Sequence, residues 1–115
     1  MLTLYGIKNC DTVKKARRWL NANGVDFQFH DFRTDGLDQS TIESWLQFVS
    51  WEVLLNKRGT TWRKLEDPRK EQLDQTTVID LMLENPTLIK RPVLTDNSNC
   101  LVGFKEADYA SHFGK

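Results

Sequence analysis

The chain has few of the residues that stabilise small proteins through cross-links or metal ions. Its 115 residues include only two cysteines, Cys10 and Cys100, and two histidines, His30 and His112. Two cysteines so far apart cannot build a disulfide framework, and the isolated histidines lack the spacing of metal ligands. We therefore expect a cytoplasmic protein of a reducing compartment that binds no metal.

An excess of one charge and a long apolar run are also absent. Lys+Arg and Asp+Glu each number 16, which makes a generally basic nucleic-acid-binding protein improbable. Hydrophobic residues make up 39%, unlike a disordered chain. No segment approaches the roughly 18 apolar residues of a membrane span, and no basic leader precedes an apolar stretch. These features predict a soluble, unprocessed, monomeric single domain over residues 1–115 with no membrane partner.

The apolar pattern predicts a strand–helix–strand unit at the start of the chain. Residues 2–6 alternate apolar and polar and end at a glycine, which indicates a short strand. Over residues 11–23 the apolar positions recur at helical spacing, and Gly24 predicts the end of that helix. Residues 25–32 alternate again. Such a connection almost always makes the two strands parallel, which predicts an α/β fold.

The middle of the chain, about residues 37–86, is predicted to be a helical insertion. Asp38 is a candidate N-cap, and Asp67-Pro68 has the pattern of a cap followed by proline at the first helical position. Helical spacing of apolar residues predicts helices over residues 38–49, over residues 51–59 with an end near Gly59, and around residues 78–82.

The residues after the predicted insertion have the pattern of a β-hairpin followed by a final helix. Residues 92–95 and 101–104 are short apolar runs, separated by the turn-forming residues 96–99. The last helix is expected from about Lys105. The predicted order is therefore β-α-β, a helical insertion, then β-β-α, without internal repeats.

Cys10 has the sequence context of a reactive thiol. It follows the first strand and a short loop, and a basic helix begins directly after it. The unpaired N–H groups of a helix N-terminus, together with the charges of Lys8, Lys14 and Lys15, favour an anion and lower a thiol pKa. Most cysteines are small buried hydrophobic residues, however, so position alone leaves both interpretations open.

Within this chain, Cys10 can form a disulfide only with Cys100, the other cysteine. Val13 stands where a CxxC motif has its second cysteine, so Cys10 cannot form that short local disulfide. Because Cys100 lies at the edge of the predicted hairpin, we favour a packing role for it over the role of a resolving cysteine.

Two arginines have the residue type and position for anion binding. Arg58 lies near the end of the second predicted helix, and Arg91 directly precedes Pro92. Guanidinium groups bind carboxylate, phosphate or arsenate oxygens through two hydrogen bonds. Residues 57–70 contain other cations as well, but runs of this kind more often form the solvent-exposed face of a helix than a ligand site.

Four segments resemble one family, in order and at the right separations. They are residues 5–16 (YGIKNCDTVKKA), 54–62 (LLNKRGTTW), 88–94 (LIKRPVL) and 101–104 (LVGF). They resemble the ArsC family of arsenate reductase-like proteins, and within it the Spx/YffB-type branch, closest to YffB. The resemblance implies a thioredoxin-like α/β fold with a helical insertion and a mixed four-stranded sheet. It also implies that Pro92 is a cis-proline beside the reactive cysteine.

The resemblance also implies roles for individual residues. Cys10 corresponds to the nucleophile, Arg91 to the arginine before the cis-proline, and Arg58 to an arginine of the insertion. The predicted substrate- or glutathione-binding set is Arg58, Arg91, Lys8, Lys14, Thr12 and Pro92. Arsenate reductases have a histidine where this chain has Gly6 and a third arginine where it has Gly103. A missing arginine removes a charge-assisted pair of ~1.5–3 kcal/mol, which argues against arsenate as the substrate.

Two functions from different classes fit these residues. The first is a glutathione-dependent thiol reductase, in which the Cys10 thiolate attacks an oxidised sulfur or oxyanion and glutathione is the co-substrate. It needs no tightly bound cofactor. The second is a non-enzymatic Spx-like regulator that binds RNA polymerase or another protein, although Val13 removes the usual CxxC switch. Direct nucleic-acid binding has only the basic run at residues 57–70 in its favour.

Overall fold

The computed structural model describes residues 2–96 and 98–115 and divides the chain into two units. We call them the sheet unit, which contains the chain up to Gly36 together with Arg91–Lys115, and the insertion unit, Leu37–Lys90. The sequence predicted an insertion over about residues 37–86, and the insertion unit extends four residues beyond that end.

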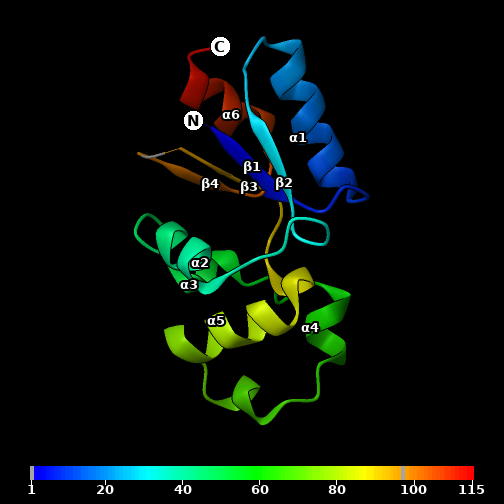
Figure 1. Cartoon of the computed structure of the whole chain (residues 1–115), viewed down its shortest axis with the longest axis vertical. Coiled ribbons are helices and arrows are strands. Elements are labelled where there is room, and N and C mark those ends of the chain that lie inside the picture. Colours follow the sequence, from blue (N-terminus) through cyan, green and yellow to red (C-terminus); the bar gives the residue numbers. More distant parts are fainter. Residues whose placement is uncertain (1, 97) are drawn as a thin grey trace. The chain divides into compact units, whose positions relative to one another are not determined.

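The sheet unit contains a mixed four-stranded sheet and two helices (Figure 1). Its elements are β1 (Thr3–Gly6), α1 (Asp11–Ala22), β2 (Gln28–Asp31), β3 (Val93–Thr95), β4 (Cys100–Val102) and α6 (Glu106–Phe113). The strand order is β2-β1-β3-β4, in which β1 and β2 are parallel and β3 is antiparallel to both β1 and β4. This arrangement confirms the predicted thioredoxin-like fold.

Helices α1 and α6 pack against the same face of this sheet. Leu4 of β1 lies opposite Leu94 of β3 in the register, and both side chains are buried with Ala16 and Leu20 of α1. Tyr109 of α6 belongs to the same cluster. The positions of α1 and α6 are therefore fixed by burial of apolar surface over the two central strands.

The predicted boundaries of the first helix are nearly those observed. Helix α1 ends at Ala22, and Gly24 follows with φ +67°, a conformation that costs glycine little. The second strand is shorter than predicted because its ladder begins at Gln28 rather than Val25. Val25 and Phe27 still pack against the core, as their alternation predicts.

The side chains of Thr95 and Asp96 both bond within the hairpin turn between β3 and β4, and the Thr95 hydroxyl donates to the Asn99 carbonyl at 2.9 Å. An oxygen of the Asp96 carboxylate accepts hydrogen bonds from the N–H groups of Ser98 and Asn99. Asn97, the second residue of the predicted turn, lies outside the described residues. Across residues 2–96 and 98–115, no helix is long and apolar enough to cross a membrane.

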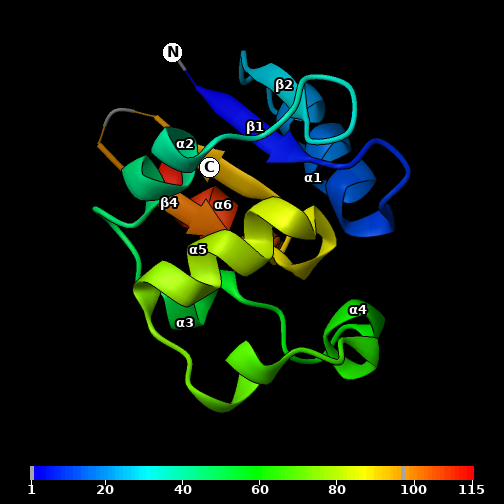
Figure 2. The same ribbon diagram turned by 60° about the horizontal axis from the view of Figure 1, so that its bottom comes forward.

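The insertion unit consists of short helices (Figure 2). They are α2 (Gln39–Trp45), α3 (Trp51–Leu54), α4 (Thr60–Lys64), the 3-10 helix η1 (Pro68–Glu71), α5 (Gln75–Glu84) and the 3-10 helix η2 (Pro86–Leu88). Asp38 caps α2 through the Thr41 N–H, and Asp67 caps η1 through the Arg69 N–H, as predicted.

Two predicted helix ends in this unit were wrong. Helix α2 ends at Trp45 rather than at Val49. Helix α3 ends at Leu54 because the chain becomes extended at Leu55, which forms an isolated antiparallel bridge with Ile89. Gly59 does not end a helix but caps the beginning of α4, a helix that the sequence analysis missed.

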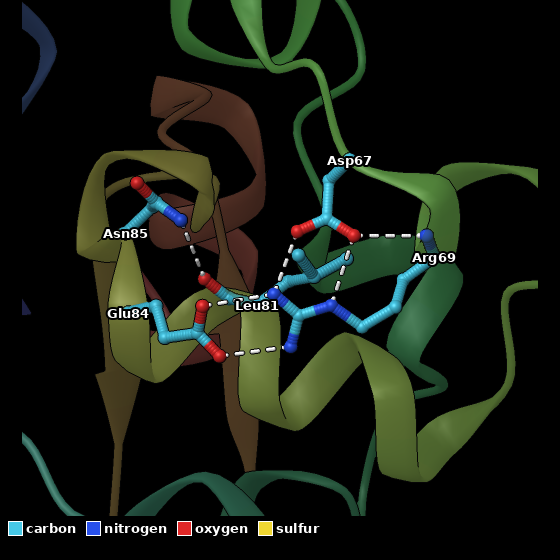
Figure 3. Close-up of polar contacts among 5 residues, drawn as sticks. All are labelled: Asp67, Arg69, Leu81, Glu84 and Asn85. Carbon is cyan, nitrogen blue, oxygen red and sulfur yellow. Dashed lines mark hydrogen bonds and ion pairs between the residues drawn. The ribbon is translucent and has the colours of Figure 1, made fainter.

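An arginine links η1 to α5 in the insertion unit (Figure 3). The Arg69 guanidinium forms ion pairs with Asp67 at 2.7 Å and with Glu84 at 2.8 Å. At the other end of α5, Asp74 and Thr77 form a capping box. These polar contacts order the loop between η1 and α5, where few apolar residues are buried.

Candidate functional site

Cys10 is the N-cap residue of α1, as the sequence predicted. The chain leaves β1 at Gly6, and the turn that follows is closed by a 3.1 Å hydrogen bond from the Cys10 N–H to the Ile7 carbonyl. The Cys10 carbonyl accepts the Lys14 N–H at 3.0 Å and so begins the helix. The half-buried sulfur therefore lies at the positive end of the helix dipole.

The surroundings of Cys10 favour its thiolate. Burial by itself raises the pKa of the thiol, because the charged form loses hydration. The N–H of Val13, the guanidinium of Arg91 with its positive charge, and the N–H of Thr12 favour the charged form, outweigh burial and lower the pKa below its ordinary value. The result is a thiol that is more ionised, and thus more reactive near neutral pH, than a free cysteine.

Arg91 reaches Cys10 from the other half of the sheet unit. The Arg91–Pro92 peptide bond is cis, which confirms the geometry implied by the family resemblance. Pro92 is buried, and its carbonyl accepts the Gly103 N–H at 2.8 Å, so this segment is tied to the residue that follows β4. The fold thus brings together Cys10, Thr12, Arg91 and Pro92 from two distant parts of the chain.

Lys8 and Lys14 do not have the predicted effect on the Cys10 thiol, whereas their role in substrate binding stays a prediction. Lys8 and Lys14 are exposed, and they are not among the groups that lower the Cys10 pKa. Helix N–H groups and a single guanidinium do this instead, because a hydrogen bond to sulfur acts at short range whereas an exposed ammonium is screened by water.

Arg58 lies in the insertion unit and not in the sheet unit that carries Cys10. It is in the turn between α3 and α4, and its N–H donates to the Asn56 side chain at 3.1 Å. The predicted position at a helix end is therefore wrong. Arg58, Lys57 and Lys90 line a hollow of about 410 Å³, together with Glu52, Val53, Leu55 and Asn56. Three cations and one carboxylate give this hollow a positive character suited to an anion.

The two departures from the arsenate reductase pattern have steric reasons. A Cβ atom at Gly6 would lie 2.7 Å from Cγ2 of Val13, so a histidine cannot enter without displacing the first turn of α1. Gly103 has φ +80°, a conformation that an arginine adopts only with strain. Neither position accepts the arsenate-binding side chain in this backbone.

Cys100 has the opposite environment to Cys10. It begins β4, opposite Thr95, and burial raises the pKa of its thiol to about 11. A neutral, partly buried thiol is a poor nucleophile, which agrees with the predicted packing role. Within the described part of the chain, no three His, Cys, Asp or Glu side chains gather as metal ligands.

One residue beside the site was not predicted from the sequence. Asp31, at the end of β2, is 6% exposed, and its carboxylate accepts the Lys8 N–H in the loop before Cys10. The only sequence signal was an acidic residue at an inward position of an otherwise apolar alternation.

Comparisons with known proteins agree with the resemblance that the motifs predicted. The ArsC family profile matches residues 5–112. An uncharacterised protein of Haemophilus influenzae is 48% identical over 113 residues, which cover 98% of this chain and 99% of that protein. The solved structure of the YffB (PA3664) protein has a TM-score of 0.92 and 46% identity, covering 96% of this chain and 97% of that one. The global transcriptional regulator Spx of Streptococcus pyogenes is 35% identical over 92% of this chain and 80% of its own length.

Proposed function

This chain belongs to the ArsC family, and we propose that it is a glutathione-dependent thiol reductase with Cys10 as its nucleophile. The observation that carries the proposal is the position of Cys10 at the N-cap of α1, where the Arg91 guanidinium and the N–H groups of Val13 and Thr12 lower the pKa of its thiol. A thiolate held in this way is the attacking group that thiol–disulfide exchange requires.

The proposed reaction reduces a mixed disulfide of glutathione. The Cys10 thiolate attacks the glutathione sulfur, a new S–S bond forms, and the substrate leaves as a thiolate that takes up a proton. The thiolate of a second glutathione then attacks the glutathione sulfur bound to Cys10. This step releases oxidised glutathione and restores the Cys10 thiolate, so one molecule of substrate is reduced for each disulfide of glutathione formed.

Arg91 and the insertion unit have separate roles in this proposal. Arg91 stabilises the Cys10 thiolate both before attack and as it leaves from the mixed disulfide. Arg58 is one of three cations in the hollow of the insertion unit that it shares with Lys57 and Lys90, and this hollow suits an anionic group such as a carboxylate of glutathione. Thr12 presents its backbone N–H to the sulfur, and Pro92 holds the neighbouring backbone.

Arsenate is the less suitable substrate for this site. Gly6 and Gly103 stand where arsenate reductases have a histidine and an arginine. An oxyanion bound here lacks one charge-assisted pair, whereas a disulfide carries no charge at the reacting sulfur and does not need that pair.

Mass spectrometry after incubation with oxidised glutathione tests this proposal. We expect a single glutathione adduct on Cys10 in the unmodified protein and in Cys100→Ser, and none in Cys10→Ser. Turnover of a mixed disulfide of glutathione should follow the same pattern. A folded Cys10→Ser protein that still reduces the substrate would overturn the mechanism, as would an adduct found on Cys100 alone.

The relationship to Spx supports a second candidate, a non-enzymatic regulator that binds RNA polymerase. Such a protein does not need a reactive thiol at Cys10. Alkylation of Cys10 measured against pH separates the two functions, because an apparent pKa at or above ~8.5 contradicts the reductase. Co-purification with RNA polymerase that survives Cys10→Ser supports the regulator instead.

A further inference from the structure

Asp31 is an unusual residue for its position. Among residues 2–96 and 98–115 it is the only polar or charged residue that is buried, with 6% of its surface exposed. A buried carboxylate is unfavourable unless hydrogen bonds replace the water that it loses, so its presence here needs specific partners.

The Asp31 carboxylate joins two loops at one end of the sheet. Asp31 lies opposite Gly6 in the parallel register of β1 and β2, where both strands end. One oxygen, Oδ2, accepts the Lys8 N–H at 3.1 Å, from the loop after β1. The other, Oδ1, accepts the Arg33 N–H at 2.7 Å, from the loop after β2.

These donors keep the buried group ionised. Burial alone raises the Asp31 pKa, but the N–H groups of Arg33, Lys8 and Thr34 and the charge of Arg33 outweigh it and lower the pKa below its ordinary value. Asp35 also faces this residue, since it accepts the Asp31 N–H at 3.0 Å.

The loop that Asp31 holds is the one that delivers Cys10. Lys8 is the second residue of the turn that the Cys10 N–H closes on the Ile7 carbonyl. A shift of Lys8 therefore moves the sulfur relative to Arg91 and to the first N–H groups of α1, on which its ionisation depends. The backbone of Lys8, and not its exposed side chain, is thus the part of this residue that serves the site.

We propose that Asp31 is a positioning residue for Cys10, whose buried carboxylate fixes the loop between β1 and α1 so that the sulfur stays beside Arg91. Its effect on turnover rests on the reductase activity proposed above, whereas its effect on the thiol does not.

Asp31→Asn tests the proposal with almost no change of shape. Whichever way the amide turns, its NH₂ group faces either the Lys8 N–H or the Arg33 N–H, so one hydrogen bond is replaced by a clash of donors. In a Cys100→Ser background, we expect Cys10 alkylation at pH 7 to slow by roughly three- to ten-fold, the range that the loss of one net hydrogen bond brings. The pH profile of alkylation should move to higher pH.

Asp35→Asn is the matched control. Asp35 bonds the Asp31 N–H but does not bond Lys8, so this variant should leave the pH profile of Cys10 unchanged. Thermal unfolding of both variants, measured in parallel, selects conditions under which each is folded. An unchanged profile in folded Asp31→Asn, or an equal shift in Asp35→Asn, would overturn the proposal.

A second measurement needs no variant. The amide NMR signal of Lys8 in the unmodified protein should shift as Asp31 is protonated in acid, together with the signal of Arg33. A Lys8 signal that does not follow this titration counts against the proposed contact. If Asp31→Asn alters Cys10 alkylation while the unmodified protein reduces no disulfide, the positioning role stands and the proposed reductase function fails.

Discussion

Gly6 connects the packing of the sheet unit to the chemistry of Cys10. It is buried at the end of β1, and the side chain of Val13 occupies the space where its Cβ atom would be. The N–H of Val13 is also one of the groups that lower the pKa of Cys10. The absence of a side chain at Gly6 therefore lets the first turn of α1 approach the strand, and with it the N–H groups that favour the thiolate.

Gly6→Ala is expected to damage both stability and reactivity. The added Cβ would lie 2.7 Å from Cγ2 of Val13, a stiff β-branched side chain that is fully buried. Overpacking of this kind costs ~1–3 kcal/mol of unfolding free energy, and moving Val13 shifts its N–H relative to the Cys10 thiolate that it favours. Denaturant unfolding measures the first effect, and the rate of Cys10 alkylation at pH 7 measures the second.

The double variant Gly6→Ala with Val13→Ala is the control for this contact. Removing the two methyl groups of Val13 makes room for the new Cβ, so the loss in the double variant should be smaller than the sum of the single losses. Additive losses would mean that Gly6 and Val13 do not share this space in solution.

Secondary-structure elements differ in how far their own sequence decides their ends. Helix α1 was predicted almost to the residue because its apolar stripe and its glycine stop lie within the segment itself. Helix α3 ends early because Leu55 pairs with Ile89, and the Asn56 N–H donates to the Leu88 carbonyl at 2.8 Å. A partner more than thirty residues away leaves no periodic signal in the local sequence.

The link between η1 and α5 should depend on pH. Hydrogen bonds and the charge of Arg69 lower the pKa of Asp67 to about 2, and Arg69 also lowers the pKa of Glu84. A carboxyl whose pKa is lower in the folded state stabilises the protein above its unfolded pKa, and this contribution is lost as pH falls through the folded pKa. The stabilisation by Arg69 is thus present at pH 7 and disappears between about pH 5 and pH 2.

Arg69→Met is expected to lower the thermal midpoint at pH 7 and to have little effect near pH 2. High salt should reduce the difference at pH 7, because both carboxylates are partly exposed. Arg63→Met is the control, since Arg63 is an exposed cation of α4 whose side chain takes no part in the ion pairs of Arg69. A midpoint difference for Arg69→Met that does not change with pH would contradict the ion-pair explanation.

At the scale of the whole molecule, the groups around one sulfur come from distant parts of the sequence. Cys10 lies near the start of the chain and Arg91 near its end, and the sheet unit joins them because β1 and β3 are neighbours. The type of each residue and the family motifs predicted this pair. The role of Asp31 was not predicted, and neither was the packing of Val13 against Gly6, where an added Cβ would lie 2.7 Å from Cγ2 of Val13. Both depend on how the chain packs in three dimensions.

The division into two units also predicts that thiolate activation and anion binding can be separated by mutation. Arg91 is among the groups that lower the Cys10 pKa, and Arg58, in the insertion unit, is not. Arg91→Ala should therefore slow alkylation of Cys10 by a neutral reagent at pH 7 by about ten-fold, through loss of a charge-assisted hydrogen bond. Arg58→Ala should leave that rate unchanged.

Binding of glutathione should show the reverse distinction. Arg58→Ala removes one cation from the hollow that it shares with Lys57 and Lys90, so the Kd for reduced glutathione, measured by calorimetry, should rise about ten-fold. Lys64 is an exposed cation of α4 outside the residues that line the hollow, and Lys64→Ala is therefore the control that should leave the Kd unchanged. An unaltered Kd in Arg58→Ala would mean that glutathione does not bind this hollow.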